Sequence, residues 1–290
     1  MTDFLLDLLS LSLGGSLAAL VLLVLSRCSR LRYGGRWRCL AWLLLCLRLA
    51  VPGAVIPVEI EVLPAPIQVE LPADRVIYEA PARQPAPVTG EMSPTAGESG
   101  AVPAPQEPGW TLSASQVIFA IWLAGGVSVL ALSLVRHRRC LAWLDQRKRP
   151  AEDPAVIRRF NRLADGMKME KRPDLGVCPA LSSPMLVGLF HPALFLPGED
   201  LGEKELEYGM LHELIHCRRR HIWLKALALW VCALHWFNPC AWLVARAVER
   251  DTELACDEEV LTCLPQDQHA AYGRAILAAA VQQKGATYET

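Results

Sequence analysis

The sequence predicts a mainly α-helical protein with several membrane-spanning helices, a small α+β domain and a re-entrant helical hairpin. Three observations lead to this fold class. Hydrophobic residues make up 52% of the 290 residues, while the formal net charge is only −1. Three apolar runs are long enough to cross a bilayer, which takes about 20 residues of helix. A fourth apolar segment, near the C-terminus, is interrupted by a turn signal.

Residues 1–56 are predicted to contain two spans. The first covers 8–26 and is uncharged, and the second covers 39–56 with Arg48 as its single charge. No basic region precedes the first run and no clear small-residue cleavage site follows it, so we expect a retained span and not a removed signal peptide. The third span covers 113–135 and is also uncharged.

The positions of Lys and Arg predict the orientation. These residues collect on the cytoplasmic side of membrane proteins. The N-terminus holds Asp3 and Asp7 and no base, so we expect it outside the cell and residues 136–290 in the cytoplasm. Basic clusters beside apolar spans are more often topological anchors than nucleic-acid contacts, so direct nucleic-acid binding is not expected. The clusters are Arg27, Arg30, Arg32, Arg36 and Arg38 after the first span, and Arg136, Arg138, Arg139, Arg147, Lys148 and Arg149 after the third.

Residues 57–112 are predicted to form a Pro-rich extracellular loop, because they contain eleven of the 21 prolines. Alternating stretches at 58–62 and 67–71 suit short strands, and the part from Pro81 onward is typical of a flexible linker. None of the ten cysteines falls in this loop and no C-x-x-C pair occurs. A disulfide framework is therefore not expected.

Residues 136–290 are predicted to form a cytoplasm-facing α+β domain that includes the apolar segment 222–245. Asp153 and Pro154 suit the N-cap and the first position of a helix. Short apolar stretches over 181–197, divided by prolines and a glycine, predict a small β-ribbon. It could receive an extended peptide as an added strand, or it could simply pack on the helix expected over 203–220.

The motif His212-Glu213-Leu214-Ile215-His216 is typical of a zinc hydrolase. Residues four apart lie on one helix face, so His212 and His216 can bind one metal ion, and Glu213 can take a proton from water. Glu253 is the candidate third ligand, since zinc accepts two imidazoles and a carboxylate. Asp257, one turn later, could fix the ring of a ligating histidine by a hydrogen bond, or it could be a solvated carboxylate. The set predicts a gluzincin-like peptidase.

The metal hypothesis requires the apolar segment 222–245 to turn back. As one straight helix it would be about 35 Å long and would place Glu253 across the membrane from His216. Phe237-Asn238-Pro239 is a turn signal near the middle. We therefore predict a helical hairpin, embedded in the membrane or lying at its interface.

Taken together, these residues resemble the BlaR/MecR-type membrane zinc peptidases, the antirepressor sensor-transducers of β-lactam resistance. The resemblance implies zinc as cofactor, His212, His216 and Glu253 as its ligands, and Glu213 as the catalytic base. It also implies a cytoplasmic zinc domain that cuts a transcriptional repressor. The matching residues are Ile121-Trp122-Leu123, Ser183-Pro184, Gly188, Pro192, Pro197, the histidine motif, Trp236-Phe237-Asn238-Pro239, Glu253 and Cys256-Asp257.

The sequence departs from that family in two places. His221 stands where the family often has Asp, and the penicillin-binding sensor domain is missing, so we expect either a fragment or a member that takes its signal elsewhere. Two other functions stay open. One is a non-catalytic membrane signalling scaffold in which zinc only joins the hairpin to the cytoplasmic domain (a zinc-stapled scaffold), and the other is a housekeeping CAAX-type protease. The expected partners are a cytoplasmic protein substrate and membrane lipid, and a homodimer is an open alternative.

Overall fold

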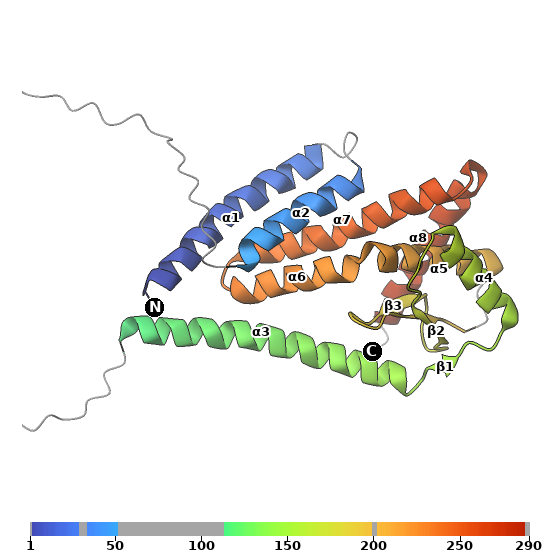
Figure 1. Cartoon of the computed structure of the whole chain (residues 1–290), viewed down its shortest axis with the longest axis horizontal. Coiled ribbons are helices and arrows are strands. Elements are labelled where there is room, and N and C mark those ends of the chain that lie inside the picture. Colours follow the sequence, from blue (N-terminus) through green and yellow to red (C-terminus); the bar gives the residue numbers. More distant parts are fainter. Residues whose placement is uncertain (1, 29–33, 52–112, 199–201, 288–290) are drawn as a thin grey trace, which may run out of the picture. The chain divides into compact units, whose positions relative to one another are not determined.

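The computed structural model describes residues 2–28, 34–51, 113–198 and 202–287 (Figure 1). These residues are mostly helical, with one small sheet. The predicted Pro-rich loop at 57–112, with its expected strands at 58–62 and 67–71, lies outside the described residues. The described residues belong to one compact unit.

Helices α1 (Thr2–Cys28) and α3 (Ala114–Asp145) are long and apolar enough to cross a membrane, and they contain the predicted spans 8–26 and 113–135. Only 17% and 0% of their most apolar windows are buried in the protein. The core helix of a soluble protein would be covered by its neighbours, whereas these helices expose apolar side chains, as lipid-facing helices do. Helix α3 begins at a capping box on Ser113 and runs past residue 135, into the basic segment.

Helix α2 (Gly35–Ala50) has 16 residues, which corresponds to a length of about 24 Å. It begins before the predicted second span at 39–56, whose last residues lie outside the described part of the chain. One face, with Trp42, Cys46 and Leu49, is buried, and the opposite face is exposed. Its length is less than the roughly 30 Å hydrocarbon core of a bilayer. The second span therefore stays a prediction.

The predicted helical hairpin is present. Helix α6 (His221–Leu234) is followed by a turn and by α7 (Pro239–Cys263), and the two helices pack together. Asn238 caps α7 by accepting the N–H of Cys240, and Pro239 occupies the first helical turn. The Asn238 side chain also donates to the hydroxyls of Ser12 and Ser16 on α1, both at 2.7 Å. The polar turn is thus satisfied among apolar helices.

A four-stranded sheet lies beside α5 (Glu203–Arg219), in the order β1-β2-β4-β3. Strands β3 (Met185–Val187) and β4 (Ala193–Leu196) form the predicted antiparallel ribbon. Strands β1 (Arg149–Pro150) and β2 (Asp174–Val177) were not predicted, and β2 pairs with β4 in parallel. Gly188 begins the β3–β4 connection at φ +95°, where a Cβ would meet the carbonyl oxygen of His191.

Three further helices complete the domain that carries the histidine motif. The predicted helix at Asp153–Pro154 is α4 (Pro154–Gly166), with the Asp153 side chain as its cap. Helix α5 ends at Arg219, the following Arg220 adopts a left-handed conformation, and α6 starts immediately afterwards. Helix α8 (His269–Thr287) packs on α5. The core here includes Leu214 and Ile215 of α5 and Val260 of α7.

Helix α7 belongs to both cores of the molecule. Its buried residues between Ala241 and Val248 share a core with α2 and α6, and Cys256 and Val260 share a core with α5. Two contacts fix α2 to it: Trp42 donates its indole N–H to the buried carboxylate of Asp251 at 2.8 Å, and Gly35 lies directly against Ala255. Because Glu253 lies between these two contacts, the position of α2 influences that of the candidate third ligand.

Replacing Gly35 by valine is expected to lower the unfolding temperature by several degrees. A Cβ at Gly35 would lie 2.5 Å from the Ala255 Cα, so α7 would have to move, and such overpacking costs about 1–3 kcal/mol. Gly14→Val is the matched control, since a Cβ at Gly14 meets nothing within 4 Å. Thermal unfolding of the detergent-solubilised chain measures both variants. Equal unfolding temperatures would contradict the close α2–α7 approach.

Candidate metal centre

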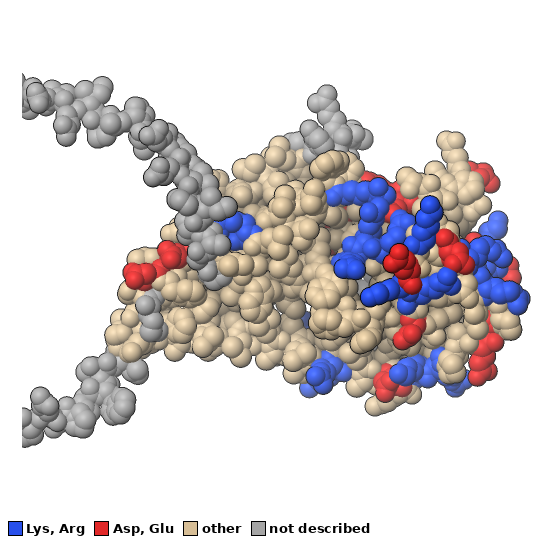
Figure 2. All heavy atoms as spheres, viewed as in Figure 1, with Lys and Arg blue, Asp and Glu red and all other residues tan. Residues whose placement is uncertain are grey.

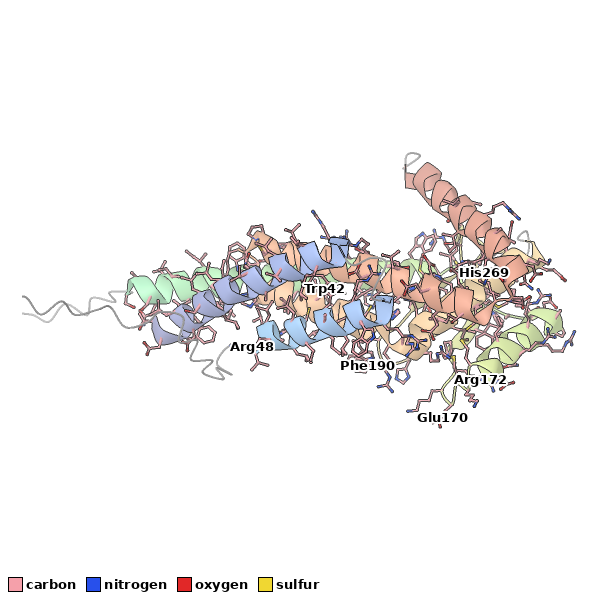
Figure 3. All side chains as sticks on the ribbon, turned by 90° about the horizontal axis from the view of Figure 1, so that it is seen from above. Trp42, Arg48, Glu170, Arg172, Phe190 and His269 are labelled. Carbon is pink, nitrogen blue, oxygen red and sulfur yellow. The ribbon has the colours of Figure 1, made fainter. Side chains whose placement is uncertain are left out.

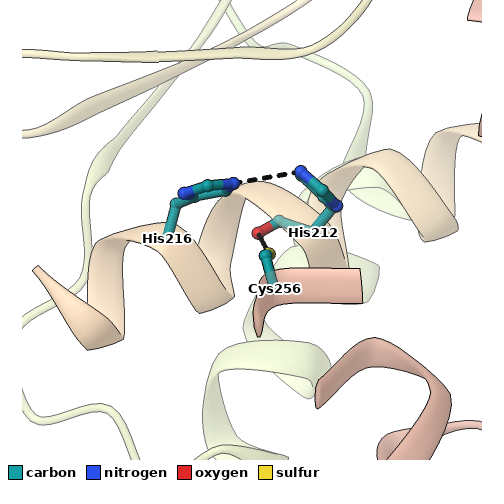
Figure 4. Close-up of side chains that lie close together, drawn as sticks. All are labelled: His212, His216 and Cys256. Carbon is teal, nitrogen blue, oxygen red and sulfur yellow. Dashed lines mark hydrogen bonds between the residues drawn. The ribbon is translucent and has the colours of Figure 1, made fainter. Parts of the chain in front are cut away.

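Helix α5 presents His212 and His216 on one face, one turn apart. Their Nε2 atoms face each other at 3.1 Å, and the rings lie side by side above α7 (Figure 4). The helical spacing brings the two rings together, as the i, i+4 pattern predicts. Both side chains are largely removed from solvent, with 18% and 11% exposure.

The reversal of the chain in the α6–α7 hairpin places Glu253 next to the two histidines. Its Oε2 atom lies 3.4 Å from Nε2 of His212 and 3.3 Å from Nε2 of His216. The three donor atoms therefore form a nearly equilateral triangle. A tetrahedral zinc ion with bonds of about 2.0–2.2 Å requires its ligand atoms to be about 3.3–3.6 Å apart. The two oxygen–nitrogen distances, 3.4 and 3.3 Å, fall in this range, and the nitrogen–nitrogen distance of 3.1 Å is 0.2 Å below it. A shift of the rings by this small amount, together with the chemistry of the donor set, fits zinc.

The electrostatics of the triangle favour a positive charge at its centre. Burial lowers the pKa of His216, but its contacts with Cys256 and Glu253 outweigh burial and raise that pKa to about 9. The pKa of Glu253 moves the opposite way: burial raises it, and the two histidines and Lys225 hold it well below the usual range. A carboxylate and two imidazoles that together attract a proton also attract a metal cation.

Two side chains contact the Nδ1 atom of His212, on the side of the ring that faces away from His216. Its Nδ1 atom lies 3.0 Å from the hydroxyl of Tyr272 and 3.3 Å from Oδ1 of Asp257. The same tyrosine hydroxyl donates to that Asp257 oxygen at 2.8 Å. A carboxylate behind a histidine favours the tautomer with the proton on Nδ1, which leaves Nε2 free for a metal ion. Asp257 thus lies where its predicted orienting role requires.

His216 is held by a second histidine. Its Nδ1 atom lies 3.0 Å from Nδ1 of His221, because the left-handed Arg220, with φ +54°, turns the chain between them. Burial and the neighbouring charge of His216 lower the pKa of His221 to about 4, so His221 is neutral near pH 7. A neutral His221 can accept the Nδ1 proton of His216. It occupies the position where the resembling family often has Asp.

Glu253 has a partner for its second oxygen. The Lys225 ammonium on α6 donates to Oε1 of Glu253 at 2.9 Å, while Oε2 faces the histidines. This contact fixes the rotation of the carboxylate. Each of the three metal-facing side chains is therefore oriented by a residue on another helix or beyond the helix break.

Glu213 lines the same cleft as His212 and Glu253. Its Oε2 atom accepts the backbone N–H of Leu186 on β3 at 3.1 Å. Burial raises the pKa of Glu213, and the nearby His212 and His216 oppose that shift. A carboxylate whose pKa is raised towards neutrality is suited to exchange a proton with water.

Cys256 also lies close to the two histidines and is an alternative third donor (Figure 4). Its thiol is fully buried and donates to the backbone carbonyl of His212 at 3.2 Å. Glu253 is the better candidate, because its oxygen is about equally distant from both Nε2 atoms and it lines the cleft. Cys256 packs beneath the site instead.

The cleft in front of the triangle has a volume of about 360 Å³. Helix α8 forms one wall, with Ala275 and Ile276, and the loop before β3 forms another, with Ser183 and Pro184. Tyr208 also lines the cleft, but its side chain is buried and its hydroxyl donates to Oε1 of Gln268 at 3.3 Å. Such a cleft accommodates a short extended segment of a protein chain.

Sequence reasoning did not identify Tyr272, Lys225 or the Leu186 amide as parts of the site. Tyr272 and Lys225 reach the site only through the packing of α8 and α6. No spacing between neighbouring residues in the sequence could therefore predict them. His221 did carry a signal, since it follows the motif by five residues and replaces an acidic residue in the resembling family.

The site has the arrangement of an HExxH metallopeptidase: two helical histidines, a glutamate from a later helix, and a second glutamate beside them. The chain belongs to the M56 peptidase family, because the family model described as BlaR1 peptidase M56 matches residues 6–289.

The chain is also similar to two kinds of curated protein. It is 25% identical over 161 residues to "Regulatory protein BlaR1" of Bacillus licheniformis, a match that covers 55% of this chain and 27% of that protein. It is 33% identical over 100 residues to "Methicillin resistance mecR1 protein" of Staphylococcus aureus, and equally to that of Staphylococcus epidermidis. These matches cover 33% of this chain and 17% of each staphylococcal protein. The chain thus matches well under a third of each relative's length.

Replacing His221 by alanine is expected to weaken zinc binding by about 10–100-fold, the usual effect of removing a partner that orients a ligand. His221→Asp restores an acceptor for the His216 Nδ1 proton and should recover most of the affinity. Competition with a chromogenic zinc chelator measures both variants, with His137→Ala on α3 as the control. If His221→Ala bound zinc like the wild type, His221 would have no positioning role.

Proposed function

We propose that this chain is a membrane-anchored zinc endopeptidase that cuts a protein on the cytoplasmic side. The observation that carries the proposal is the triangle of His212, His216 and Glu253 donor atoms, with Glu213 in the same cleft. A structural zinc site would be closed by a fourth protein ligand and would need no neighbouring base.

In this proposal His212, His216 and Glu253 hold the ion and Glu213 is the general base. Zinc, when bound, supplies Lewis-acid chemistry that acidifies water and polarises a peptide carbonyl. Glu213 takes the proton of the attacking water and passes it to the leaving amine. Tyr272 and Asp257 keep the proton of His212 on Nδ1, and His221 does the same for His216.

Substrate binding is proposed along strand β3. This strand is at one edge of the sheet, and its Leu186 N–H points towards Glu213 and away from β4. An extended peptide added alongside β3 would pass the histidines, held by main-chain hydrogen bonds. This supports the predicted ability of the ribbon to receive a substrate strand.

Membrane anchoring is supported by the apolar, uncovered helices α1 and α3. Basic residues follow both helices in the sequence, which favours a cytoplasmic peptidase domain and an external N-terminus. The apolar hairpin of α6 and α7 would lie in the membrane or at its surface. The names of the relatives, a regulatory protein and a resistance protein, suggest a substrate in signalling, and we propose a transcriptional repressor.

Glu213→Ala is expected to keep zinc but to lower cleavage by at least about a hundredfold, since a general base contributes roughly 10²–10⁴-fold. Glu253→Ala should lose both zinc and cleavage. The matched control is Glu170→Ala, an exposed side chain outside the cleft (Figure 3). Zinc content of the purified chain and new protein N-termini in expressing cells are the measurements.

The same comparison separates the alternatives. Fragments that require Glu213 establish an endopeptidase and name its substrate, and a repressor among them supports the signalling role. Broad clipping of many proteins would indicate a housekeeping protease instead. Signalling that continues unchanged in Glu213→Ala would favour a zinc-stapled scaffold.

A further inference from the structure

A second hollow, separate from the peptidase cleft, lies between α2, α6 and α7. It has a volume of about 500 Å³, which is in the range of small-molecule sites. Its walls along α2 and α6 are apolar and include Leu40, Leu43, Leu224 and Leu227. The mechanism proposed for the peptidase uses none of these leucines.

One end of this groove is strongly basic. Of the described residues that line it, Arg36, Arg219 and Arg220 carry positive charge and Glu259 alone carries negative charge, which leaves a net +2. The Glu259 carboxylate is only 3% exposed. It binds Arg219 through two hydrogen bonds, of 2.7 and 3.0 Å, and it pairs with Arg36 at 3.3 Å.

Glu259 cannot neutralise the cations around it, because a third arginine, Arg218, also pairs with it. Burial and the nearby charges of Arg36 and Arg218 lower the pKa of Arg219, so the guanidinium groups repel one another. Such a cluster is stabilised by an added anion. Guanidinium groups match phosphate particularly well, because they donate paired hydrogen bonds from a rigid plane.

The basic end lies where the sparsely charged part of the molecule meets the part that is rich in charged side chains (Figure 2). Figure 2 shows Lys and Arg side chains gathered at this boundary, near the start of α2 and the α5–α6 junction. Two exposed tryptophans accompany the groove arginines: Trp37, at 67%, follows Arg36 in the sequence, and Trp223, at 44%, lines the groove. Tryptophan is enriched at the level of lipid headgroups.

We propose that this groove binds an anionic phospholipid, with the phosphate at Arg36, Arg219 and Arg220 and one acyl chain along the four leucines. Basic pockets between membrane helices are suited to such headgroups. A zwitterionic lipid would leave the net +2 uncompensated, and a purely apolar ligand would make no use of the arginines. The proposal rests on membrane placement of the helices but not on proteolysis.

The test uses the full chain in nanodiscs made of equal amounts of phosphatidylglycerol and phosphatidylcholine. After extraction in detergent, native mass spectrometry measures which lipid stays bound. We expect phosphatidylglycerol to be retained at least about tenfold over phosphatidylcholine. The double variant Arg36→Gln/Arg220→Gln should lose this preference, and Leu43→Trp, which fills the groove, should lose the bound lipid.

Matched controls on α3 exclude general effects of the substitutions. Arg138→Gln removes an exposed charge and Leu132→Trp enlarges an exposed apolar side chain, so both should retain phosphatidylglycerol like the wild type. Equal retention of the two lipids by the wild type, or retention of phosphatidylglycerol by both groove variants, would overturn the proposal. So would displacement of the lipid by soluble glycerol phosphate, because the acyl chain would then contribute nothing.

The readout is lipid binding, so it is independent of whether the chain cuts a substrate. An inactive peptidase that retains phosphatidylglycerol would sustain the lipid site while contradicting the proposed function. A chain with Glu213-dependent cleavage and no lipid preference would support the proposed function and contradict the lipid site. As a second measurement, phosphatidylglycerol should raise the unfolding temperature of the wild type and not that of the arginine double variant.

Discussion

The architecture depends on bringing one carboxylate oxygen within 3.4 Å of two imidazole nitrogens that lie on another helix. Glu253 follows His216 by 37 residues, and most of the interval is apolar enough to prefer lipid. A continuous apolar helix over this interval would carry Glu253 away from His216. The turn at Asn238 reverses the chain and brings Glu253 back. The polar side chain of Asn238 is in turn satisfied by Ser12 and Ser16 of α1. The position of the candidate metal centre therefore depends on the packing of the apolar helix α1 against the hairpin turn.

Much of the fold and of the candidate site could be predicted from patterns of residues that are close together in the sequence. The i, i+4 histidines, the Asp153 cap, the β3–β4 ribbon and the turn before Pro239 each depend on residues close together in the sequence, and the structure contains all of them. Strands β1 and β2 were missed because they are two and four residues long and pair across long sequence separations. Tyr272 and Lys225 were missed because helix packing, which no local pattern encodes, brings them to the site.

The residues behind the metal-facing side chains come from different parts of the chain. Tyr272 belongs to α8, Asp257 to α7, and His221 and Lys225 to α6. A complete site thus exists only when all these helices are docked on α5. His221 also lines the groove between α2 and α6. His221 therefore connects the candidate metal centre with the proposed lipid site, because it contacts His216 on one side and lines the groove on the other.

The continuity of α7 limits how the sequence can change by insertion. Fourteen residues, 239–252, separate the Asn238 cap from Glu253, and all of them lie on one unbroken helix. Adding or deleting a single residue there would rotate Glu253 by about 100° and shift it about 1.5 Å along the axis. The carboxylate would then point away from His212 and His216. The number of residues between Asn238 and Glu253 is therefore set by the helical repeat, which must bring the carboxylate to the face turned towards α5.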